Sequence, residues 1–377
     1  MRPAAQVGDA VHAVATPALV IDLDAMQRNL AAMAGFAQRH HLRLRPHAKM
    51  HKCAAIARLQ MAAGAVGVCV QKLSEAEALA DAGVNGGVNG GVSDIFISNE
   101  IVDPAKLARV AALAQRIRLS VAVDSGLGIE RLAQALKGVG GSVDVFVEID
   151  VGQGRCGVAP ADAARMAQQV VSHGLRFAGL HAYHGKAQHL RTPAEREAAI
   201  RHAVLAVRTA QARLTAAGIP GGLVTGAGTG SFAFEAASGV YGELQPGSYL
   251  LMDDDYAANQ PTPNAPVFEQ AVFVKSQVMS RSHSHAVVDA GHKAHAIDSG
   301  LPRVWGRDLG YENGGDEHGI LHPRGDVLPA LGDSVWLVPG HCDPTVNLHD
   351  HFIAVRGGLQ HGRVEAVWRI DARGCLQ

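Results

Sequence analysis

The sequence predicts an α/β chain that folds into a (β/α)8 barrel and a second, mostly β domain. Short apolar runs alternate with helical patterns over the first two thirds of the chain, which is typical of a parallel sheet. Eight such runs follow the first one, and eight is the strand count of a closed (β/α)8 barrel. After about residue 260, alternating runs of β character replace the helical patterns. At 377 residues, the chain is also long enough for two cores.

The predicted barrel domain spans residues 16–255. An apolar run at 18–21 follows Thr16-Pro17, and the acidic residues after it cap a helix that ends near His40. The expected barrel strands lie at 42–45, 65–70, 94–98, 119–123, 143–149, 177–183, 222–224 and 244–251. The expected helices between them lie at 72–82, 104–114, 127–136, 161–172 and 193–217.

The second domain is expected to comprise residues 1–15 together with 256–377. Three prolines between 261 and 266 form a linker, and β-like runs follow at 270–279, 285–288, 334–338, 351–356 and 364–370. A strand near 11–21 precedes the first barrel strand and has no obvious place inside the barrel, so we expect it to pair with this domain. The segment 83–92 repeats Val-Asn-Gly-Gly, which we interpret as a tolerated loop insertion.

Composition excludes several classes of protein. A formal net charge of -1 gives no reason to expect nucleic acid or an anionic membrane as a partner. No apolar run reaches the roughly 18 residues that a transmembrane helix needs. The five cysteines form no CxxC pair and are odd in number, which favours a reducing compartment. We therefore expect a cytoplasmic protein.

Lys49 lies in the run Arg-Pro-His-Ala-Lys-Met-His-Lys at 45–52, directly after the first expected barrel strand. Crowding by other cations lowers the pKa of a lysine, and Schiff-base chemistry requires a neutral amine. A solvated basic loop is the alternative interpretation. The rest of the chain decides between the two.

Two glycine-rich segments, 225–231 and 245–249, follow the seventh and eighth barrel strands. Barrels often hold a phosphate group between these two loops, and backbone N–H groups at the start of a helix suit a phosphate dianion. One such turn is weak support for a phosphate site. Two turns at these positions predict it more strongly.

Two further motifs end the fifth and sixth barrel strands. Arg155 stands between glycines, which let the backbone turn tightly and aim the guanidinium into the barrel mouth. In the alternative interpretation, Arg155 forms an ion pair with Asp150 that only stabilises the fold. On the next strand, alternation places His181 and Tyr183 on one face and His184 on the other. His184 is either a ring stacked on a flat cofactor or a hydrogen-bonded core histidine.

The last motif, Pro-Gly-His-Cys-Asp-Pro at 339–344, lies in the second domain. Where the backbone is extended, His341 and Asp343 point the same way and can bind one metal ion, while Cys342 points away. Imidazole with carboxylate favours Mn²⁺, Co²⁺ or Mg²⁺ over a thiolate-bound zinc. Two protein ligands leave positions open for water and substrate.

Together these motifs resemble the fold-type III pyridoxal-phosphate enzymes, and within them the D-threonine aldolase and D-serine dehydratase group, from Thr16 to about Leu348. The resemblance implies an alanine-racemase-like barrel and makes Lys49 the Schiff-base residue. It implies that Arg155 meets the phenolic oxygen of pyridoxal 5′-phosphate, that His184 faces its ring, and that Tyr183 contacts it. The 5′-phosphate would be held by Thr229, Gly230, Ser231, Gly247, Ser248 and Tyr249.

The same resemblance implies the reaction. In this group the dehydratases show the pattern His-x-Cys, whereas the aldolases, which use manganese or a similar ion, show His-x-Asp. Here the pattern is His-x-Asp, formed by His341 and Asp343. We therefore expect D-threonine aldolase activity on D-β-hydroxy-α-amino acids. The metal would bind the β-hydroxyl, and His189 or a metal-bound water would take its proton. The relatives imply a homodimer in which each β domain covers the other barrel. A D-serine or D-threo-3-hydroxyaspartate dehydratase is the alternative, and a pyridoxal-phosphate homeostasis protein is a further one.

Overall fold

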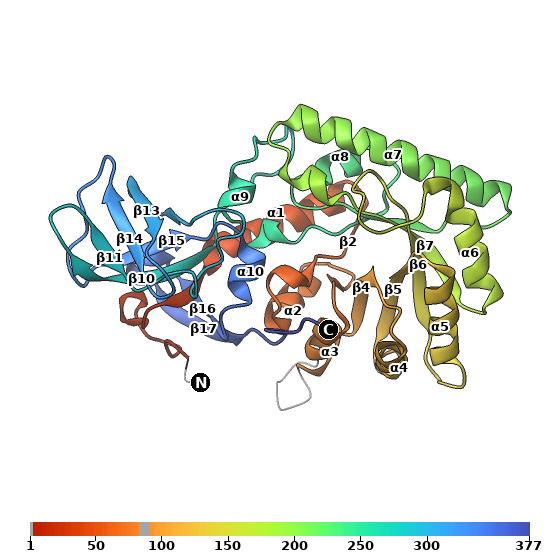
Figure 1. Cartoon of the computed structure of the whole chain (residues 1–377), viewed down its shortest axis with the longest axis horizontal. Coiled ribbons are helices and arrows are strands. Elements are labelled where there is room, and N and C mark those ends of the chain that lie inside the picture. Colours follow the sequence, from red (N-terminus) through yellow and green to blue (C-terminus); the bar gives the residue numbers. More distant parts are fainter. Residues whose placement is uncertain (1–2, 83–90) are drawn as a thin grey trace.

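The computed structural model describes residues 3–82 and 91–377. Figure 1 shows two lobes, one with helices around a sheet and the other built mainly from strands. The two-domain α/β architecture is therefore confirmed. The predicted loop insertion at 83–92 lies, apart from its last two residues, outside the described residues.

The barrel sheet has eight parallel strands in the order β2-β9-β8-β7-β6-β5-β4-β3. A parallel bridge between His47 and Cys69 joins the two ends of this order and closes the barrel. The expected eight strands are thus all present, although the last one is much shorter than predicted. Their bounds are β2 Arg43–Leu44, β3 Val68–Val70, β4 Asp94–Glu100, β5 Arg118–Val123, β6 Val143–Glu148, β7 Arg176–Ala182, β8 Leu223–Gly226 and β9 Glu243–Leu244.

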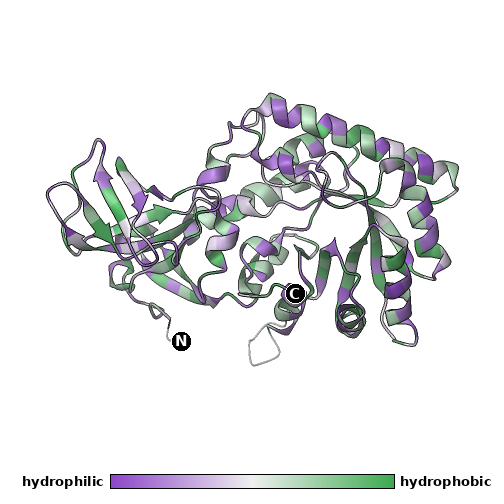
Figure 2. Ribbon diagram, viewed as in Figure 1, coloured by the Kyte–Doolittle hydropathy of each residue, from purple (hydrophilic) through white to green (hydrophobic). Residues whose placement is uncertain are grey.

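The helices that follow the barrel strands bury mostly apolar residues, together with polar ones such as Gln60, Glu75 and Arg196. The longest has the N-cap Thr192, whose hydroxyl accepts from the amide of Glu195 while the Glu195 carboxylate accepts from the amide of Thr192. Figure 2 shows hydrophilic and hydrophobic residues along this same helix, α7. The bounds are α2 Ala54–Ala62, α3 Leu73–Asp81, α4 Pro104–Leu113, α5 Gly126–Leu136, α6 Ala163–Ser172, α7 Pro193–Ala216 and α8 Phe232–Ala237.

The second sheet begins with the N-terminal strand. β1 (Ala18–Asp22) lies inside the predicted barrel limits of 16–255, yet it pairs antiparallel with β10 (Val272–Arg281) and parallel with β16 (His351–Arg356). The expected pairing of an early strand with the second domain is therefore seen. The remaining strands are β11 Ala286–Val288, β12 Arg303–Val304, β13 Leu309–Asn313, β14 Gly319–Pro323, β15 Ser334–Val338 and β17 Arg363–Arg369. Sequence patterns missed β12, β13 and β14.

Three helices lie at the junction of the two lobes. α1 (Leu23–Arg39) connects β1 to the barrel, and its apolar face packs in one cluster with residues of both lobes. The short helices α9 (Asp254–Ala257) and α10 (Cys342–Val346) lie where the lobes meet, and α11 (Gly358–His361) joins β16 to β17. Among the described residues, no helix combines the length and apolar character that crossing a membrane requires.

Candidate active site

A cavity of about 310 Å³ opens at the C-terminal ends of the barrel strands. Active sites of (β/α)8 barrels lie at this end because the loops that follow the strands converge there. We call it the barrel-mouth cavity. Four of the sequence-predicted site residues line it, namely Lys49, Arg155, Tyr183 and His189. It is also lined by polar residues that sequence reasoning did not select: His47, Gln71, Ser98, His181 and Gln245.

Lys49 lies one turn after β2 and reaches across to the β domain. Its Nζ atom is 3.1 Å from Oδ2 of Asp343, and this carboxylate raises the pKa of Lys49. The prediction that neighbouring cations lower the lysine pKa is therefore wrong for the chain as it stands. The flanking histidines carry little charge, because burial lowers the pKa of His47 well below its ordinary value and that of His51 to about 4.

Arg155 extends over the cavity beside Tyr183, with its guanidinium carbon 5.8 Å from the centre of the ring. The alternative pairing with Asp150 is not seen, because Oδ1 of Asp150 accepts the amides of Gly152 and Gly154 instead. These bonds fold the loop after β6 into a tight turn, and Gly154 adopts a φ of +66° there. The turn, as predicted from the glycines, directs Arg155 into the barrel mouth.

The residues at and just after the end of β7 do not all line the cavity. His181 and Tyr183 line the cavity. His184 does not belong to this lining; it is buried, and its Nε2 lies 3.2 Å from where a Cβ at Gly152 would be. The expectation that His184 faces a cofactor ring stays a prediction. β7 ends at Ala182, so His184 lies beyond the strand and its alternation.

His181 is instead the centre of a buried polar chain. Its Nδ1 lies 2.8 Å from Oε2 of Glu148 and its Nε2 lies 3.3 Å from Oε1 of Gln245. Burial of the ring disfavours its charge, but the Glu148 carboxylate outweighs burial and raises the pKa of His181. Gln245 is bonded in turn to Thr225. This chain presents polar atoms at the floor of the barrel-mouth cavity.

The two glycine-rich loops lie against each other, as expected for loops after adjacent strands. The amide of Tyr249 donates to Oγ of Thr229 at 2.9 Å, and the amide of Gly230 donates to Gln188 Oε1 at 2.9 Å. A Cβ at Gly247 would lie 2.9 Å from the carbonyl oxygen of His47, so this loop needs glycine to pass beside the lysine segment.

Two side chains of the predicted phosphate set are already occupied by other partners. The Ser231 hydroxyl donates to Glu235 Oε1 and accepts from Gln188, both at 2.7 Å. The Tyr249 ring is fully buried, and its hydroxyl accepts from Gln60 at 3.2 Å. The side chains of both residues are therefore engaged within the protein, and their part in a phosphate site stays a prediction. Ser248 is also buried.

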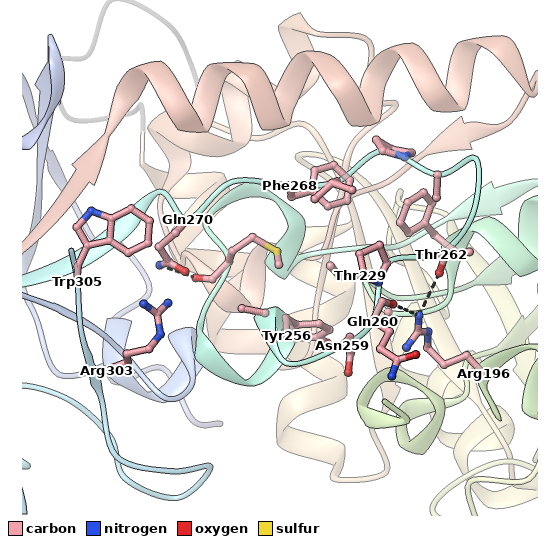
Figure 3. Close-up of a pocket in the computed structure, with 18 residues that line it drawn as sticks. Arg196, Thr229, Tyr256, Asn259, Gln260, Thr262, Phe268, Gln270, Arg303 and Trp305 are labelled. Atoms are coloured by element: carbon pink, nitrogen blue, oxygen red, sulfur yellow. Dashed lines mark hydrogen bonds between the residues drawn. The ribbon is translucent and has the colours of Figure 1, made fainter. Parts of the chain in front are cut away.

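Thr229 and Gly230 also line a second cavity, of about 350 Å³, which shares no lining residue with the barrel-mouth cavity. Figure 3 shows Arg303 and Arg196 toward opposite ends of this second cavity, with Tyr256 and Asn259 between them. The loop after β8 thus borders the second cavity and contributes no residue to the lining of the barrel-mouth cavity. Residues of α9 and the segment after it form much of the wall of the second one.

His341 and Asp343 meet at the β-domain side of the site. Nε2 of His341 lies 3.9 Å from Oδ1 of Asp343, so both could contact one ion. The backbone is extended only at His341, because α10 starts at Cys342. The predicted extended geometry is therefore wrong beyond His341. Cys342 is fully buried and its thiol donates to Asp343 Oδ1 at 3.4 Å.

Two aspartates that the sequence analysis missed hold the histidines of this site. Asp253 Oδ2 lies 2.8 Å from Nδ1 of His341, and Asp255 Oδ2 lies 2.6 Å from Nδ1 of His189. The bond from His189 lowers the pKa of Asp255 to about 2. The three consecutive aspartates that follow the last barrel strand were the available signal, since the loops at that end of a barrel carry its active site.

The charges around His341 and Asp343 reinforce each other. Burial alone would disfavour charge on both side chains. The bond to Asp253 nevertheless raises the pKa of His341 to about 9, and the positive charge of Lys49 lowers the pKa of Asp343 to about 2. At neutral pH and without a metal, the site thus pairs an ionised carboxylate with a protonated imidazole, and a divalent cation that binds both would displace the proton on Nε2 of His341. A carboxylate with an imidazole suits a cation of borderline or hard character.

Comparison with known proteins finds matches along nearly the whole chain. Residues 21–255 match the family of alanine racemase N-terminal domains, and residues 271–355 match a serine dehydratase domain family. A D-threonine aldolase of Arthrobacter sp is 46% identical over 99% of this chain and 97% of its own length. A 3-hydroxy-D-aspartate aldolase of Paracoccus denitrificans is 42% identical over 96% of this chain and 92% of its own.

The same similarity holds in three dimensions. The crystal structure of D-threonine aldolase from Filomicrobium marinum superimposes with a TM-score of 0.94 at 49% identity and covers 100% of both chains.

Proposed function

The chain belongs to the alanine racemase N-terminal domain family, in the group of two-domain lyases that includes the D-threonine aldolases, and from this membership and the site we propose that it is a D-threonine aldolase. It cleaves the Cα–Cβ bond of a D-β-hydroxy-α-amino acid to glycine and an aldehyde. We propose pyridoxal 5′-phosphate and a divalent metal, with Mn²⁺ expected, as its cofactors.

One observation carries the proposal: Lys49 of the barrel and Asp343 of the β domain are 3.1 Å apart. The lysine that would hold the cofactor and the carboxylate that would hold the metal therefore share one site. A substrate bound through its amino group near Lys49 would place its β-hydroxyl close to His341 and Asp343. A barrel without the β domain could not supply this second group.

The residues present fit pyridoxal 5′-phosphate. The cavity lies beside Lys49, Arg155 can meet an anionic oxygen, and the Gly247 loop approaches the lysine segment too closely for any side chain. The backbone of the loops after β8 and β9 would hold the phosphate. When bound, the cofactor supplies an electron sink for the electron pair left at Cα when the Cα–Cβ bond breaks.

The side chains around the cavity would orient the substrate and handle its proton. Tyr183 and Arg155 form one wall, and His181 with Gln245 forms the floor. His189 lines the cavity with Nδ1 bound to Asp255, so its Nε2 is the nitrogen available to accept the β-hydroxyl proton. Water on the metal is the alternative base.

A divalent metal at His341 and Asp343 supplies a Lewis acid that lowers the pKa of a bound hydroxyl. The same carboxylate that would bind the metal now contacts Lys49, so a metal at Asp343 would compensate the charge that raises the lysine pKa. Lys49 would then be freer to react as a neutral amine.

We propose that the protein acts as a homodimer. The β domain exposes apolar side chains that a second copy could cover, with Ile297 44%, Leu301 43% and Trp305 40% exposed. Sedimentation velocity over a hundredfold range of concentration tests this proposal, and a monomer at every concentration would refute it.

A product assay tests the reaction. Purified protein loaded with cofactor and Mn²⁺ is incubated with D-threonine, and glycine and acetaldehyde are the expected products. A dehydratase is the second candidate, because residues 271–355 match a serine dehydratase domain. It would give 2-oxobutanoate and ammonia instead, and that outcome would overturn the proposed aldolase. Omitting Mn²⁺ after chelation is the matched control.

A further inference from the structure

The three consecutive aspartates at the start of α9 each bind a different partner. Asp253 contacts His341 of the β domain, Asp254 binds Arg303 with Oδ1 2.6 Å from its Nε, and Asp255 contacts His189 of the barrel. Residues 253–255, which we call the aspartate turn, therefore touch both of the histidines that the proposed function uses. The inference below rests on that function.

Both carboxylate oxygens of Asp253 already accept hydrogen bonds within the protein. Oδ2 accepts from Nδ1 of His341 and from the amide of Cys342, both at 2.8 Å, and Oδ1 accepts from the amide of Tyr256 at 2.9 Å. The side chain is fully buried. An ionised carboxylate only accepts hydrogen bonds, so Nδ1 must carry the hydrogen and Nε2 faces Asp343.

The backbone of the aspartate turn also binds the segment that carries His341. The amides of Asp254 and Asp255 donate to the carbonyl oxygens of Pro339 and Gly340, at 3.0 and 3.1 Å. Together with the two bonds to Asp253 Oδ2, four hydrogen bonds hold the chain on the N-terminal side of Asp343. The position of His341 thus follows that of the aspartate turn.

Asp255 holds the other histidine and the loop that carries it. Its Oδ2 binds Nδ1 of His189, while Arg191 donates both to its Oδ1 and to its carbonyl oxygen. Further along, Asn259 donates to the carbonyl of Gln188 at 2.8 Å. Because Nδ1 is occupied, Nε2 is the nitrogen of His189 left for a proton in the cavity.

We propose that the aspartate turn is a shared positioning element: Asp253 presents Nε2 of His341 to the metal, and Asp255 presents Nε2 of His189 to the substrate hydroxyl. Neither aspartate contacts metal or substrate itself. Carboxylates that bind the second nitrogen of a metal-ligating histidine fix its tautomer and ring orientation. Here two positions of one turn, Asp253 and Asp255, would do this for a metal ligand and a base.

The test uses three single substitutions of the same chemistry: Asp253→Asn, Asp254→Asn and Asp255→Asn. Mn²⁺ binding to cofactor-loaded protein is measured by the EPR signal of the free ion, and kcat and KM for D-threonine are measured alongside. Asp253→Asn should weaken Mn²⁺ binding about tenfold or more, because an amide no longer forces the hydrogen onto Nδ1. Asp255→Asn should leave Mn²⁺ binding within about twofold and lower kcat about tenfold or more at nearly constant KM.

Asp254→Asn is the control, because the Asp254 side chain binds Arg303 at the second cavity, while its amide, which binds Pro339, is kept in the variant. This variant should change neither quantity. Asp253→Glu keeps a carboxylate and should recover part of the Mn²⁺ affinity, which also covers a failure of the Asn variant to fold. Equal Mn²⁺ affinities in all three Asn variants would overturn the inference. So would an Asp253→Glu variant that binds Mn²⁺ no more tightly than a folded Asp253→Asn variant. A parent protein that binds no Mn²⁺ would instead refute the proposed metal and this inference with it.

Discussion

On the barrel side of the candidate site, Lys49 and Tyr183 lie within a few residues of a strand end, so regular structure brings them to the cavity. On the β-domain side, His341 is held by an aspartate 88 residues earlier in the chain. His189 of the barrel also depends on a distant partner, Asp255. Local periodicity therefore places the residues near strand ends, whereas tertiary contacts place the two histidines.

The largest expected effect falls on the barrel side. Lys49→Ala should lower kcat by more than ~10³-fold, because it removes the amine proposed to hold the cofactor and return its proton. The absorbance of lysine-bound cofactor should disappear in the same variant. Arg155→Lys, which keeps a cation on the same wall, is the matched control and should retain that absorbance. An unchanged spectrum in Lys49→Ala would contradict the assignment.

A smaller loss is expected on the β-domain side. Asp343→Ala should keep the cofactor spectrum and lower kcat by about 10²–10³-fold, because it removes the carboxylate proposed to bind the metal. Treatment of the parent with EDTA should give a loss of similar size that Mn²⁺ reverses. Full activity in EDTA would show that the site needs no metal, and the two halves would then not differ as described.

A pH-dependent change in stability is expected on the barrel side, at Glu235 of α8. Burial raises the pKa of Glu235 to about 7, and its Oε2 has no hydrogen-bond partner among the described residues. The folded protein then holds this proton more tightly than the unfolded chain, so stability falls as pH rises from about 4.5 through 7. Glu235→Gln should be more stable than the parent by roughly 2–3 kcal/mol at pH 8 and equal below pH 4.5. Urea unfolding at both pH values measures the difference, and a pH-independent difference would exclude this explanation.

The smallest effect is expected at Cys342. Cys342→Ala should change Mn²⁺ affinity by less than about twofold, since the thiol is buried and only donates to Asp343, and should lower stability by about 1 kcal/mol because of the small cavity. EPR titration and thermal unfolding measure the two quantities. A large loss of metal affinity would make Cys342 a ligand and bring the site closer to the dehydratase pattern.

The fold could be predicted from sequence because strand and helix periods persist over eight units. The same reasoning identified Lys49, Arg155 and Tyr183 in the cavity, since each follows a strand that could be located. It failed for the lysine pKa, because the approach of Asp343 from another domain is invisible in local sequence. It also missed Asp253 and Asp255, whose roles depend on partners that only the folded chain brings near.

The aspartate turn also determines where this chain can be cut and rejoined. Its side chains and amides bind the segment before α10, while Asp255 and Asn259 bind the loop of His189. A chimera with a relative must therefore take the His189 loop, residues 253–259 and residues 339–343 from the same parent. A crossover at about residue 250 would separate the His189 loop from the residues that hold it, whereas a crossover within the proline linker would separate the turn from His341. Only matched pairs of these segments preserve both contacts.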